Sequence, residues 1–473
     1  MKTTVGVFFG GRSTEHEISV ISALQAINAF NKEKYEIIPI YITKQGRWFS
    51  GDALLEVKNY RDMAALQNMC AEVYMIPEYG DYNLYRKKRA LFGNNIWAKL
   101  DVVIPVLHGS NGEDGIFEGI LESIGIPYAG CNTLSSANGM DKITMKMIME
   151  KSGIPIVDYV WFTDKQWFAQ RDKLIEEIET RLGYPVIVKP ANLGSSVGIS
   201  HADNREELIA KVDVAEKYST RIVIEDMVEE LKEINCSVLG DCDDYRTSVC
   251  EEPIKSGDIL TYEDKYMGGG KSNKGMQATQ KRIPADLSPK DTARVQFLAG
   301  ETFRVLSCHG VARVDFMIDG KSGDIYVNEI NTIPGSLSFY LWEASGIRFD
   351  QLMDKLVDLA LKRKRESSMK TVSYDQNIFN LGKGFLNFGL ADPHVGQLGV
   401  VEFGGVLDQG GVAAGADVRN NRIDGGLHVG LGADVTVQNF LGAYLIKVIQ
   451  TDHFARASFI LFSSSVSWAY LNL

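Results

Sequence analysis

The sequence has no surplus of positive charge, no paired cysteine motif and no long apolar run, and each absence excludes a class of protein. Its 50 Lys and Arg residues against 61 Asp and Glu residues give a net charge of −11 and a pI near 5.3. Binding along a nucleic-acid backbone needs a concentrated basic face, so the composition argues against nucleic acid as a partner. A polyanion would instead be held by a few placed cations, backbone N–H groups and a metal ion.

The cysteines and the apolar segments bear on the compartment. None of the six cysteines stands in a CxxC pair, which predicts buried free thiols in a reducing cytoplasm rather than a zinc or redox site. The apolar run Val5–Phe9 is too short for a signal peptide. Residues 459–473 are apolar but broken by serines and fall short of the ~20 residues of a spanning helix, so we expect a strand or a buried segment there. These features predict a cytoplasmic protein with no membrane partner.

The first part of the chain predicts a parallel α/β layer, in which a strand is followed by a helix and a second strand. The predicted elements are a strand at 4–9, a helix at 19–31, a strand at 36–42, an insertion of helical and irregular structure at 50–95, and a buried strand at 101–107. Glycine loops follow two of these strands, at 10–17 and 108–115. Ligands in such sheets sit beyond the carboxyl ends of the strands, so both loops are predicted to face one crevice.

At 473 residues the chain is too long for one hydrophobic core, which rarely grows beyond ~250–300 residues. We predict an N-terminal α/β domain at 1–138, a central subdomain at 139–222, a C-terminal subdomain at 223–366, and a glycine-rich extension at 367–473. The extension holds 15 glycines between residues 382 and 442, which predicts short strands or a loosely ordered tail and supplies no site.

A lysine followed by a glycine and serine loop is the strongest single motif. A β-branched strand, predicted at 185–189, ends in Lys189, and the loop 191–198 follows it. The N–H groups and hydroxyls of this loop can wrap a triphosphate while Lys189 supplies a point charge. The lysine precedes the glycines, so this is not a Walker loop. If the segment stood alone, a tight hairpin with a solvated lysine would be the favoured interpretation.

Two alternating strands carry a candidate metal site. They are predicted at 311–318 and 325–331. The period of 2 puts Arg313 and Asp315 on one face of the first strand, and Glu329 and Asn331 on one face of the second. Oxygen ligands from Asp315, Glu329 and Asn331 suit Mg²⁺ bound between carboxylates and phosphates. A surface hairpin with outward polar residues explains the spacing equally well.

Five motifs in this order resemble the signature set of the D-alanine–D-alanine ligases, over residues 1–365. They are Gly10-Gly-Arg-Ser-Thr-Glu15-His-Glu-Ile-Ser19, His108-Gly-Ser-Asn-Gly-Glu-Asp-Gly115, the loop from Lys189 to Gly198, Arg313-Val-Asp315, and Asn328-Glu-Ile-Asn-Thr-Ile-Pro-Gly335. The resemblance implies an ATP-grasp fold, in which two α+β subdomains enclose ATP beside an N-terminal α/β domain that helps to hold the amino acids. It also implies a homodimer formed through the N-terminal domain.

The resemblance implies a role for each matched residue. Glu15, assisted by His108, would bind the ammonium of a first D-alanine and link through Ser195 to Tyr266. The ATP-binding residues would be Lys142, Lys189, Ser195, Ser196, Gly198, Glu225, Glu233 and Lys265, of which Glu225 and Glu233 contact adenine and ribose. Two Mg²⁺ or Mn²⁺ ions would be held by Asp315, Glu329 and Asn331. The polar loop 255–280, which contains Lys265 and Tyr266, resembles a lid that excludes water.

The implied reaction is ATP-driven amide formation through an acyl phosphate, for peptidoglycan synthesis. A carboxylate oxygen attacks the γ-phosphoryl group, and the amine of a second amino acid then attacks the acyl carbon. Arg313 and the N–H of Gly335 are the matched candidates for stabilising the oxyanion. The implied catalytic set is Glu15, Ser195, Arg313, Gly335 and Tyr266, and the substrate-binding set is Glu15, His108, Arg313, Gly335 and Tyr340.

Position 340 departs from the family pattern. The best-known members have a serine five residues after the Pro-Gly glycine, where it binds the carboxylate of the second substrate, but here this position is Tyr340. A phenol can still donate a hydrogen bond, and D-serine or D-lactate as second substrate stays open. Tyr266 favours D-alanine over D-lactate. The alternative from another class is a non-catalytic binding protein on the same fold, against which the complete set of Lys189, Arg313 and the metal ligands argues.

Overall fold

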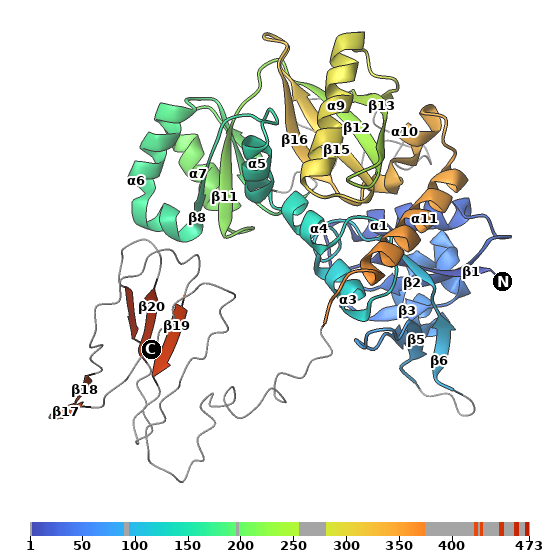
Figure 1. Cartoon of the computed structure of the whole chain (residues 1–473). Coiled ribbons are helices and arrows are strands. Elements are labelled where there is room, and N and C mark those ends of the chain that lie inside the picture. Colours follow the sequence, from blue (N-terminus) through green and yellow to red (C-terminus); the bar gives the residue numbers. More distant parts are fainter. Residues whose placement is uncertain are drawn as a thin grey trace, which may run out of the picture. The chain divides into compact units, whose positions relative to one another are not determined.

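The protein is described here from a computed structural model (Figure 1). The structure describes residues 2–88, 94–194, 198–254 and 281–373, together with the backbone of five short strands after residue 420. The chain divides into two compact units, Met1–Lys370 and Thr371–Leu473. Within the described residues, no helix combines the length and the apolar character needed to cross a membrane.

The first sheet contains the predicted parallel layer. Strand β1 (Thr3–Gly10) lies between β2 (Tyr35–Ile42) and β7 (Val102–Val106) and runs parallel to both. Alternate side chains of β1 enter two cores, because helices cover both faces of the sheet. Val5, Val7 and Phe9 pack in one core with α1 (His16–Ala29) and α11 (Phe349–Ser368), and Phe8 packs in the other with α3 (Ile116–Ile124).

The insertion at 50–95 is more regular than predicted, and that prediction was partly wrong. Its described part holds β4 (Ala71–Tyr74), β5 (Asn83–Arg86), α2 (Met63–Met69) and two 3-10 turns (Asp52–Leu55 and Val57–Arg61). With β3 (Trp48–Ser50) and β6 (Ile96–Lys99), these strands extend the first sheet beyond β2 in antiparallel order. Strands β4 and β5 each bury one side chain, Val73 and Leu84, so no alternation is visible in the sequence.

The second sheet is antiparallel, in the order β10-β9-β11-β8. Its strands are β8 (Tyr159–Thr163), β9 (Val186–Pro190), β10 (Ser200–Ala202) and β11 (Arg221–Asp226), and helices α6 (Asp164–Arg181) and α7 (Arg205–Ala215) share its core. The predicted boundary between residues 222 and 223 falls inside β11. Because β11 pairs with both β8 and β9, the boundary moves to after Asp226. The boundary was misplaced because the apolar pattern of β11 predicts a strand but not the sheet that the strand joins.

The third sheet has the order β14-β13-β12-β15-β16, and α9 (Pro289–Val305) packs in its core (Figure 1). Its strands are β12 (Lys232–Gly240), β13 (Tyr245–Pro253), β14 (Lys281–Arg282), β15 (Gly310–Ile318) and β16 (Ile325–Asn331). Helices α4 (Thr133–Met140) and α5 (Lys142–Lys151) lead from the first sheet to the second, and α10 (Phe339–Ala344) leads to α11. Helix α11 returns to the core of the first sheet.

The second unit contains short strands, which is one of the two structures that its composition predicts. They are β17 (Asn421–Ile423), β18 (Gly426–His428), β19 (Tyr444–Val448), β20 (Ser458–Phe462) and β21 (Ala469–Asn472). Strands β19, β20 and β21 form one antiparallel sheet, and β17 pairs with β18. The apolar end of the chain, where we expected a strand or a buried segment, contains strands.

Candidate active site

Two lysines meet a buried carboxylate between the second and third sheets. Lys189 of β9 donates from Nζ to Glu225 Oε2 at 2.7 Å and to Asn328 Oδ1 of β16 at 3.2 Å. The Nζ of Lys146 lies 3.3 Å from Glu225 Oε1. Burial alone would raise the pKa of Glu225, but the charges of Lys146 and Lys189 lower it to about 2. Glu225 is thus a charged carboxylate that holds two ammonium groups, and its contact with adenine or ribose stays a prediction.

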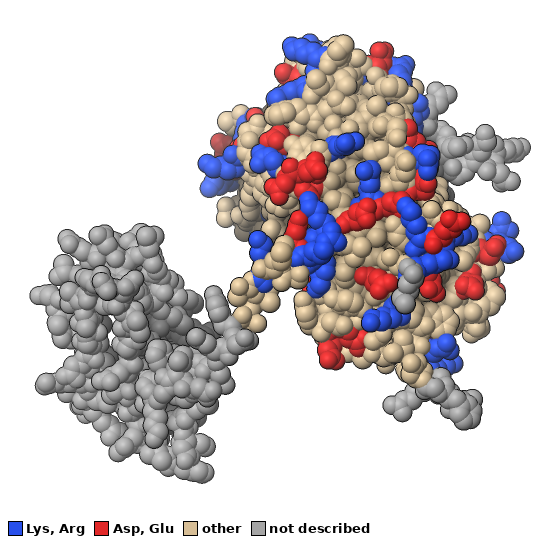
Figure 2. Space-filling view, turned by 45° about the vertical axis from the view of Figure 1, so that its right-hand side comes forward, with Lys and Arg blue, Asp and Glu red and all other residues tan. Residues whose placement is uncertain are grey.

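Lys142, at the N-terminal end of α5, adds a third ammonium. Its Nζ donates to the carbonyl oxygen of Leu193 at 2.9 Å and lies 3.3 Å from Glu329 Oε2. Lys142 and Lys146 are four residues apart, which puts them on one face of the helix, and this spacing was the signal by which Lys146 could have been found. Basic side chains on the surface shown in Figure 2 are mixed with acidic ones, whereas these three lysines are buried.

The predicted metal ligands lie together on β15 and β16. Asp315 stands directly opposite Glu329, and Arg313 stands opposite Asn331. Arg313 donates from Nε and Nη2 to the two oxygens of Asp315, both at 2.7 Å, and Asn331 Nδ2 donates to Asp315 Oδ2 at 3.0 Å. Burial lowers the pKa of Arg313, but Asp315 and, more weakly, Tyr340 and Glu251 raise it above its ordinary value. Arg313 is therefore charged.

This donor set fits a hard divalent cation. Asp315, Glu329 and the amide oxygen of Asn331 offer oxygen ligands only, which suit Mg²⁺ or Mn²⁺. Within the described part of the chain, no group of three or more His, Cys, Asp and Glu side chains could hold a metal by itself. A cation at Asp315 and Glu329 would therefore need further oxygens, such as those of Asn331 and of phosphates.

A hydrogen-bond chain joins the first sheet to the segment after β16. His108 Nδ1 lies 2.8 Å from the carbonyl oxygen of Ile333, and His108 Nε2 lies 2.9 Å from Ser22 Oγ. A carbonyl can only accept, so Nδ1 carries the proton and Nε2 accepts from the Ser22 hydroxyl. The Ser22 hydroxyl in turn accepts from the N–H of Ser336 at 3.0 Å. Burial lowers the pKa of His108, which makes it a neutral positioning group in this chain.

Glu113 holds the other side of the same backbone. Its Oε1 accepts from the N–H of Ile333 at 3.1 Å, and its Oε2 accepts from the N–H of Gly109 at 2.8 Å. Burial, followed by the charge of Glu15, raises the pKa of Glu113 to about 8, against the effect of these two N–H groups. Both backbone polar groups of Ile333 are therefore bound by side chains of the His108–Gly115 loop.

Glu15 lies where three of the predicted motifs meet. It is buried, next to the first residue of α1. A Cβ atom added to Gly109 would lie 2.7 Å from Glu15 Oε2, and one added to Gly194 would lie 3.2 Å from the same oxygen. These glycines leave room for the carboxylate between the His108 loop and the loop that follows Lys189. Asn111 Nδ2 also donates to the carbonyl oxygen of Arg12 at 3.0 Å, so the two N-terminal loops are in contact.

Gly335 begins a turn of unusual backbone. The next three residues, Ser336, Leu337 and Ser338, have left-handed φ values of 51°, 52° and 51°. Such conformations in non-glycine residues cost about 1–3 kcal/mol each and persist where the surroundings impose them, as the Ser22 contact does here. A Cβ atom added to Gly335 would meet no heavy atom within 4 Å. The turn therefore leaves space beside the residue predicted to bind the oxyanion.

Tyr340, the residue that departs from the family pattern, lies in a charged cluster. Its hydroxyl donates to Glu251 Oε2 of β13 at 2.9 Å. Lys281 Nζ lies 3.0 Å from Glu251 Oε1 and 4.0 Å from the centre of the Tyr340 ring. Glu251 and Lys281 were not predicted as site residues, because neither belongs to a motif.

The other predicted residues divide into two groups. Glu233 lies on β12 and Gly198 at the start of the segment before β10, with a left-handed φ of 76° that suits glycine. Ser195, Ser196, Lys265, Tyr266 and the predicted lid at 255–280 lie outside the described residues.

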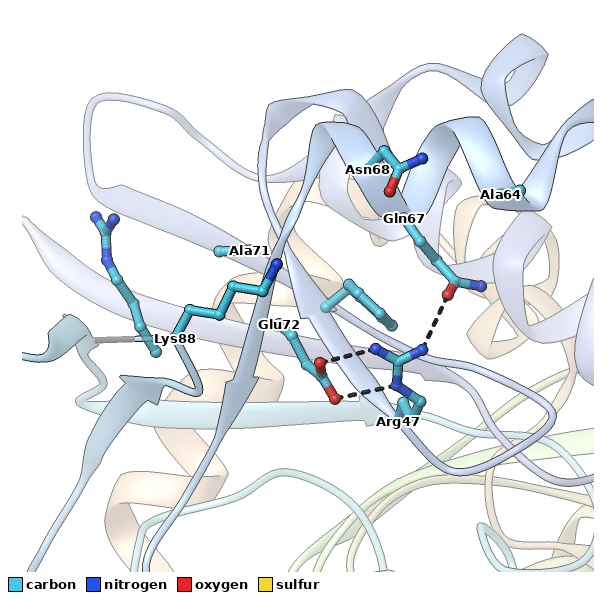
Figure 3. A pocket seen from close by; sticks show the side chains of 9 residues that line it. Arg47, Ala64, Gln67, Asn68, Ala71, Glu72 and Lys88 are labelled. Carbon is cyan, nitrogen blue, oxygen red and sulfur yellow. Dashed lines mark hydrogen bonds and ion pairs between the residues drawn. The ribbon is translucent and has the colours of Figure 1, made fainter. Parts of the chain in front are cut away.

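A hollow of about 450 Å³ lies apart from all these residues, over the insertion in the first sheet (Figure 3). Arg47 binds Glu72 through Nε at 3.0 Å and Nη2 at 2.7 Å, and its Nη1 reaches Gln67 at 3.5 Å. No predicted site residue lines it.

The assembled groups define a class of protein. A nucleotide-dependent ligase needs three kinds of group, and the site contains all of them. They are lysines beside a glycine loop, paired carboxylates on adjacent strands, and an arginine that one of these carboxylates binds. A family model described as the D-ala D-ala ligase N-terminus matches residues 4–131, and one described as the C-terminus matches residues 148–358. The chain belongs to the D-alanine–D-alanine ligase family, and its fold is the ATP-grasp fold predicted from the sequence.

Individual relatives agree with this placement. A D-alanine–D-alanine ligase of Natranaerobius thermophilus is 40% identical over 388 residues, which cover 80% of this chain and 100% of the relative. The solved structure of the VanG D-Ala:D-Ser ligase from Enterococcus faecalis is 32% identical with a TM-score of 0.65, covering 76% of this chain and 100% of that one. A Bacillus anthracis D-alanine–D-alanine ligase complexed with ATP is 26% identical with a TM-score of 0.54, covering 77% and 99%.

Proposed function

We propose that this protein uses ATP to join two D-alanines into D-alanyl-D-alanine for peptidoglycan synthesis, as a cytoplasmic homodimer. One observation carries the proposal: a continuous row of charged groups runs from the three buried lysines, through Glu329 and Asp315, to Arg313. Such a row suits a triphosphate and its metal at one end and a reacting carbonyl at the other. The names of the relatives support D-alanine as the substrate.

In the first step, a carboxylate oxygen of one D-alanine attacks the γ-phosphorus of ATP, the bond to ADP breaks, and an acyl phosphate forms. Lys142 and Lys189 would hold the phosphates, and Lys146 would act through Glu225, which it helps to keep charged. A divalent cation held by the ligand set on β15 and β16 would neutralise phosphate charge.

In the second step, the neutral amine of the other D-alanine attacks the acyl carbon, and the tetrahedral oxyanion then expels phosphate as the nitrogen releases a proton. Arg313, oriented by its two hydrogen bonds to Asp315, and the N–H of Gly335 would stabilise the oxyanion. Glu15 would bind the ammonium of the first D-alanine. His108 would assist by fixing Ile333 and hence the turn at Gly335, because both of its ring nitrogens are engaged.

The test is stoichiometric. Purified protein given ATP, Mg²⁺ and D-alanine should release one phosphate for each dipeptide formed, and no release with any D-amino acid would refute the proposal. Lys189→Ala should abolish turnover, because phosphate binding and the partner of Glu225 are lost together. Lys217→Ala, which removes an exposed lysine, is the matched control and should keep full activity.

A second candidate is ligation of D-alanine to D-serine. Two observations favour it: the likeness to a structure named a D-Ala:D-Ser ligase, and Tyr340 in place of the expected serine. Competition of D-alanine, D-serine and D-lactate as second substrates, with the product masses measured, decides between the candidates.

A further inference from the structure

The cluster around Tyr340 contains a buried carboxylate that the reaction described above does not use. Glu251 is 1% exposed and receives Tyr340 Oη at 2.9 Å, Lys281 Nζ at 3.0 Å and Asn235 Nδ2 at 3.3 Å. A buried carboxylate is tolerated only when it is paired and hydrogen-bonded, and Glu251 meets both conditions. Its effect is to fix two neighbours, a phenol and an ammonium, in one arrangement.

Lys281 is the member of this cluster that can take a further partner. Its ammonium has three donor positions, of which one is directed to Glu251 while the face of the Tyr340 ring covers another side at 4.0 Å. The side chain is 34% exposed, so the Lys281 side chain is partly open to solvent. Tyr340 differs, because it is half-buried and its hydroxyl proton is committed to Glu251.

The cluster adjoins the group that would stabilise the oxyanion. Glu251 lies on β13 and Arg313 on β15, and Asn235 of the intervening β12 contacts Glu251 and stands opposite Asp315. The charges of Tyr340 and Glu251 also contribute to the raised pKa of Arg313. Glu251, the partner of Lys281, therefore lies two strands from Arg313 in the same sheet.

The chemistry of the second step requires a cation at such a position. The attacking amino acid must present a neutral amine, but its own carboxylate stays charged and has to be held away from the acyl phosphate. Arg313 already makes two hydrogen bonds to Asp315. We propose that Lys281 binds the carboxylate of the second amino acid, and that Glu251 and Tyr340 position the Lys281 ammonium. This inference rests on the proposed function.

The decisive comparison uses two nucleophiles that differ only in the carboxylate. D-Alaninamide has the amine of D-alanine but a neutral amide in place of the carboxylate, so it can act only as the second substrate. With D-alanine as first substrate, Lys281→Ala should lower kcat/KM for D-alanine as nucleophile by about tenfold to hundredfold, through KM, as expected when a bond to a charged group is lost. The reaction with D-alaninamide should change by less than about twofold. Lys281→Arg should restore most of the activity with D-alanine.

The first half-reaction supplies an internal check. Hydroxylamine captures the acyl phosphate as D-alanine hydroxamate with release of phosphate, and it needs no carboxylate site. Lys281→Ala should form hydroxamate at the wild-type rate, which also shows that the variant is folded. The matched control is Arg282→Ala, because the neighbouring Arg282 pairs with Glu252 at 3.1 Å and not with Glu251. This control should leave both nucleophiles unaffected.

Two results would overturn the assignment. One is an equal loss of D-alanine and D-alaninamide reactivity in Lys281→Ala, and the other is an unchanged preference between them. Absence of hydroxamate from the wild-type protein is a separate outcome, which would overturn the proposed function and this assignment with it.

Discussion

The two ends of the site, around Ile333 and around Tyr340, are built from different interactions. At the first end, His108 and Ser22 are buried, Glu113 is half-buried, and the three side chains bind backbone and hydroxyl groups. At the second end, Glu251 and Lys281 meet as opposite charges, and the Lys281 side chain is partly open to solvent. A buried, fully bonded network fixes geometry, whereas a charged pair near solvent responds to salt and to substitution. The first end holds the turn at Gly335, and the second end is where we propose that the second substrate is selected.

Among the changes that compare the two ends, the largest effect is expected from His108→Ala. The change removes the donor to the Ile333 carbonyl and the acceptor of the Ser22 hydroxyl proton, both in a buried place. Misplacing one oxyanion donor costs about 10²–10³-fold in kcat, so we expect losses of about 100-fold in both hydroxamate and dipeptide formation. Ser22→Ala, which keeps the bond to Ile333, should lose about tenfold. A loss confined to dipeptide formation would contradict the division between the two ends.

Tyr340→Phe tests the second end and should act more weakly. It removes the hydroxyl that donates to Glu251 and keeps the ring beneath the Lys281 ammonium. We expect the preference for D-alanine over D-alaninamide as nucleophile to fall about threefold to tenfold, while hydroxamate formation is unchanged. Tyr245→Phe, whose hydroxyl lies 3.4 Å from Glu301, is the matched control. Slower hydroxamate formation in Tyr340→Phe would show that the two ends are not independent.

Salt should separate the two ends without any mutation. Raising the ionic strength from about 0.1 M to about 1 M shortens the screening length from about 10 Å to about 3 Å. The nucleophile preference of the wild-type protein should fall about twofold to threefold, because Lys281 is partly exposed. In Lys281→Ala, the nucleophile preference should not change with ionic strength. A salt effect of equal size in that variant would rule out Lys281 as its source.

Glu118→Gln should change stability and leave catalysis as it is. Burial raises the pKa of Glu118, on α3, to about 8, against 4.5 for an ordinary glutamate. The folded protein therefore keeps a proton that the unfolded chain loses, and stability falls as pH rises from about 4.5 towards about 8. Glutamine cannot ionise, so the variant should exceed the wild type by about 1–3 kcal/mol in free energy of unfolding at pH 8 and by little at pH 5. Urea unfolding at both pH values measures this, and parallel pH profiles would contradict it.

The sequence predicts what is local and misses what long-range pairing brings together. Strands with regular alternation, such as β1, β15 and β16, were predicted to within a few residues, and the structure gathers their motif residues at one site. The partners of those residues were missed. His108 binds Ile333 across 225 positions, and no periodicity links the two. The sequence does not show which strands lie beside the strand that carries Glu251. It also gives no sign that Lys281 differs from an ordinary charged residue, because its contact with the Tyr340 ring is seen only in the structure.

The end of α11, the last helix of the first unit, offers a place to attach a label to the protein. The buried side chains of α11 lie between Leu352 and Ala360, and residues 365–373 are exposed. Relatives matched over their full length align with only 80% of this chain, so the family fold accommodates a long addition. The end of α11 is therefore a suitable anchor for a dye, a surface tether or a fused reporter, because a group attached there contacts no core side chain and leaves the ligase free to work while immobilised.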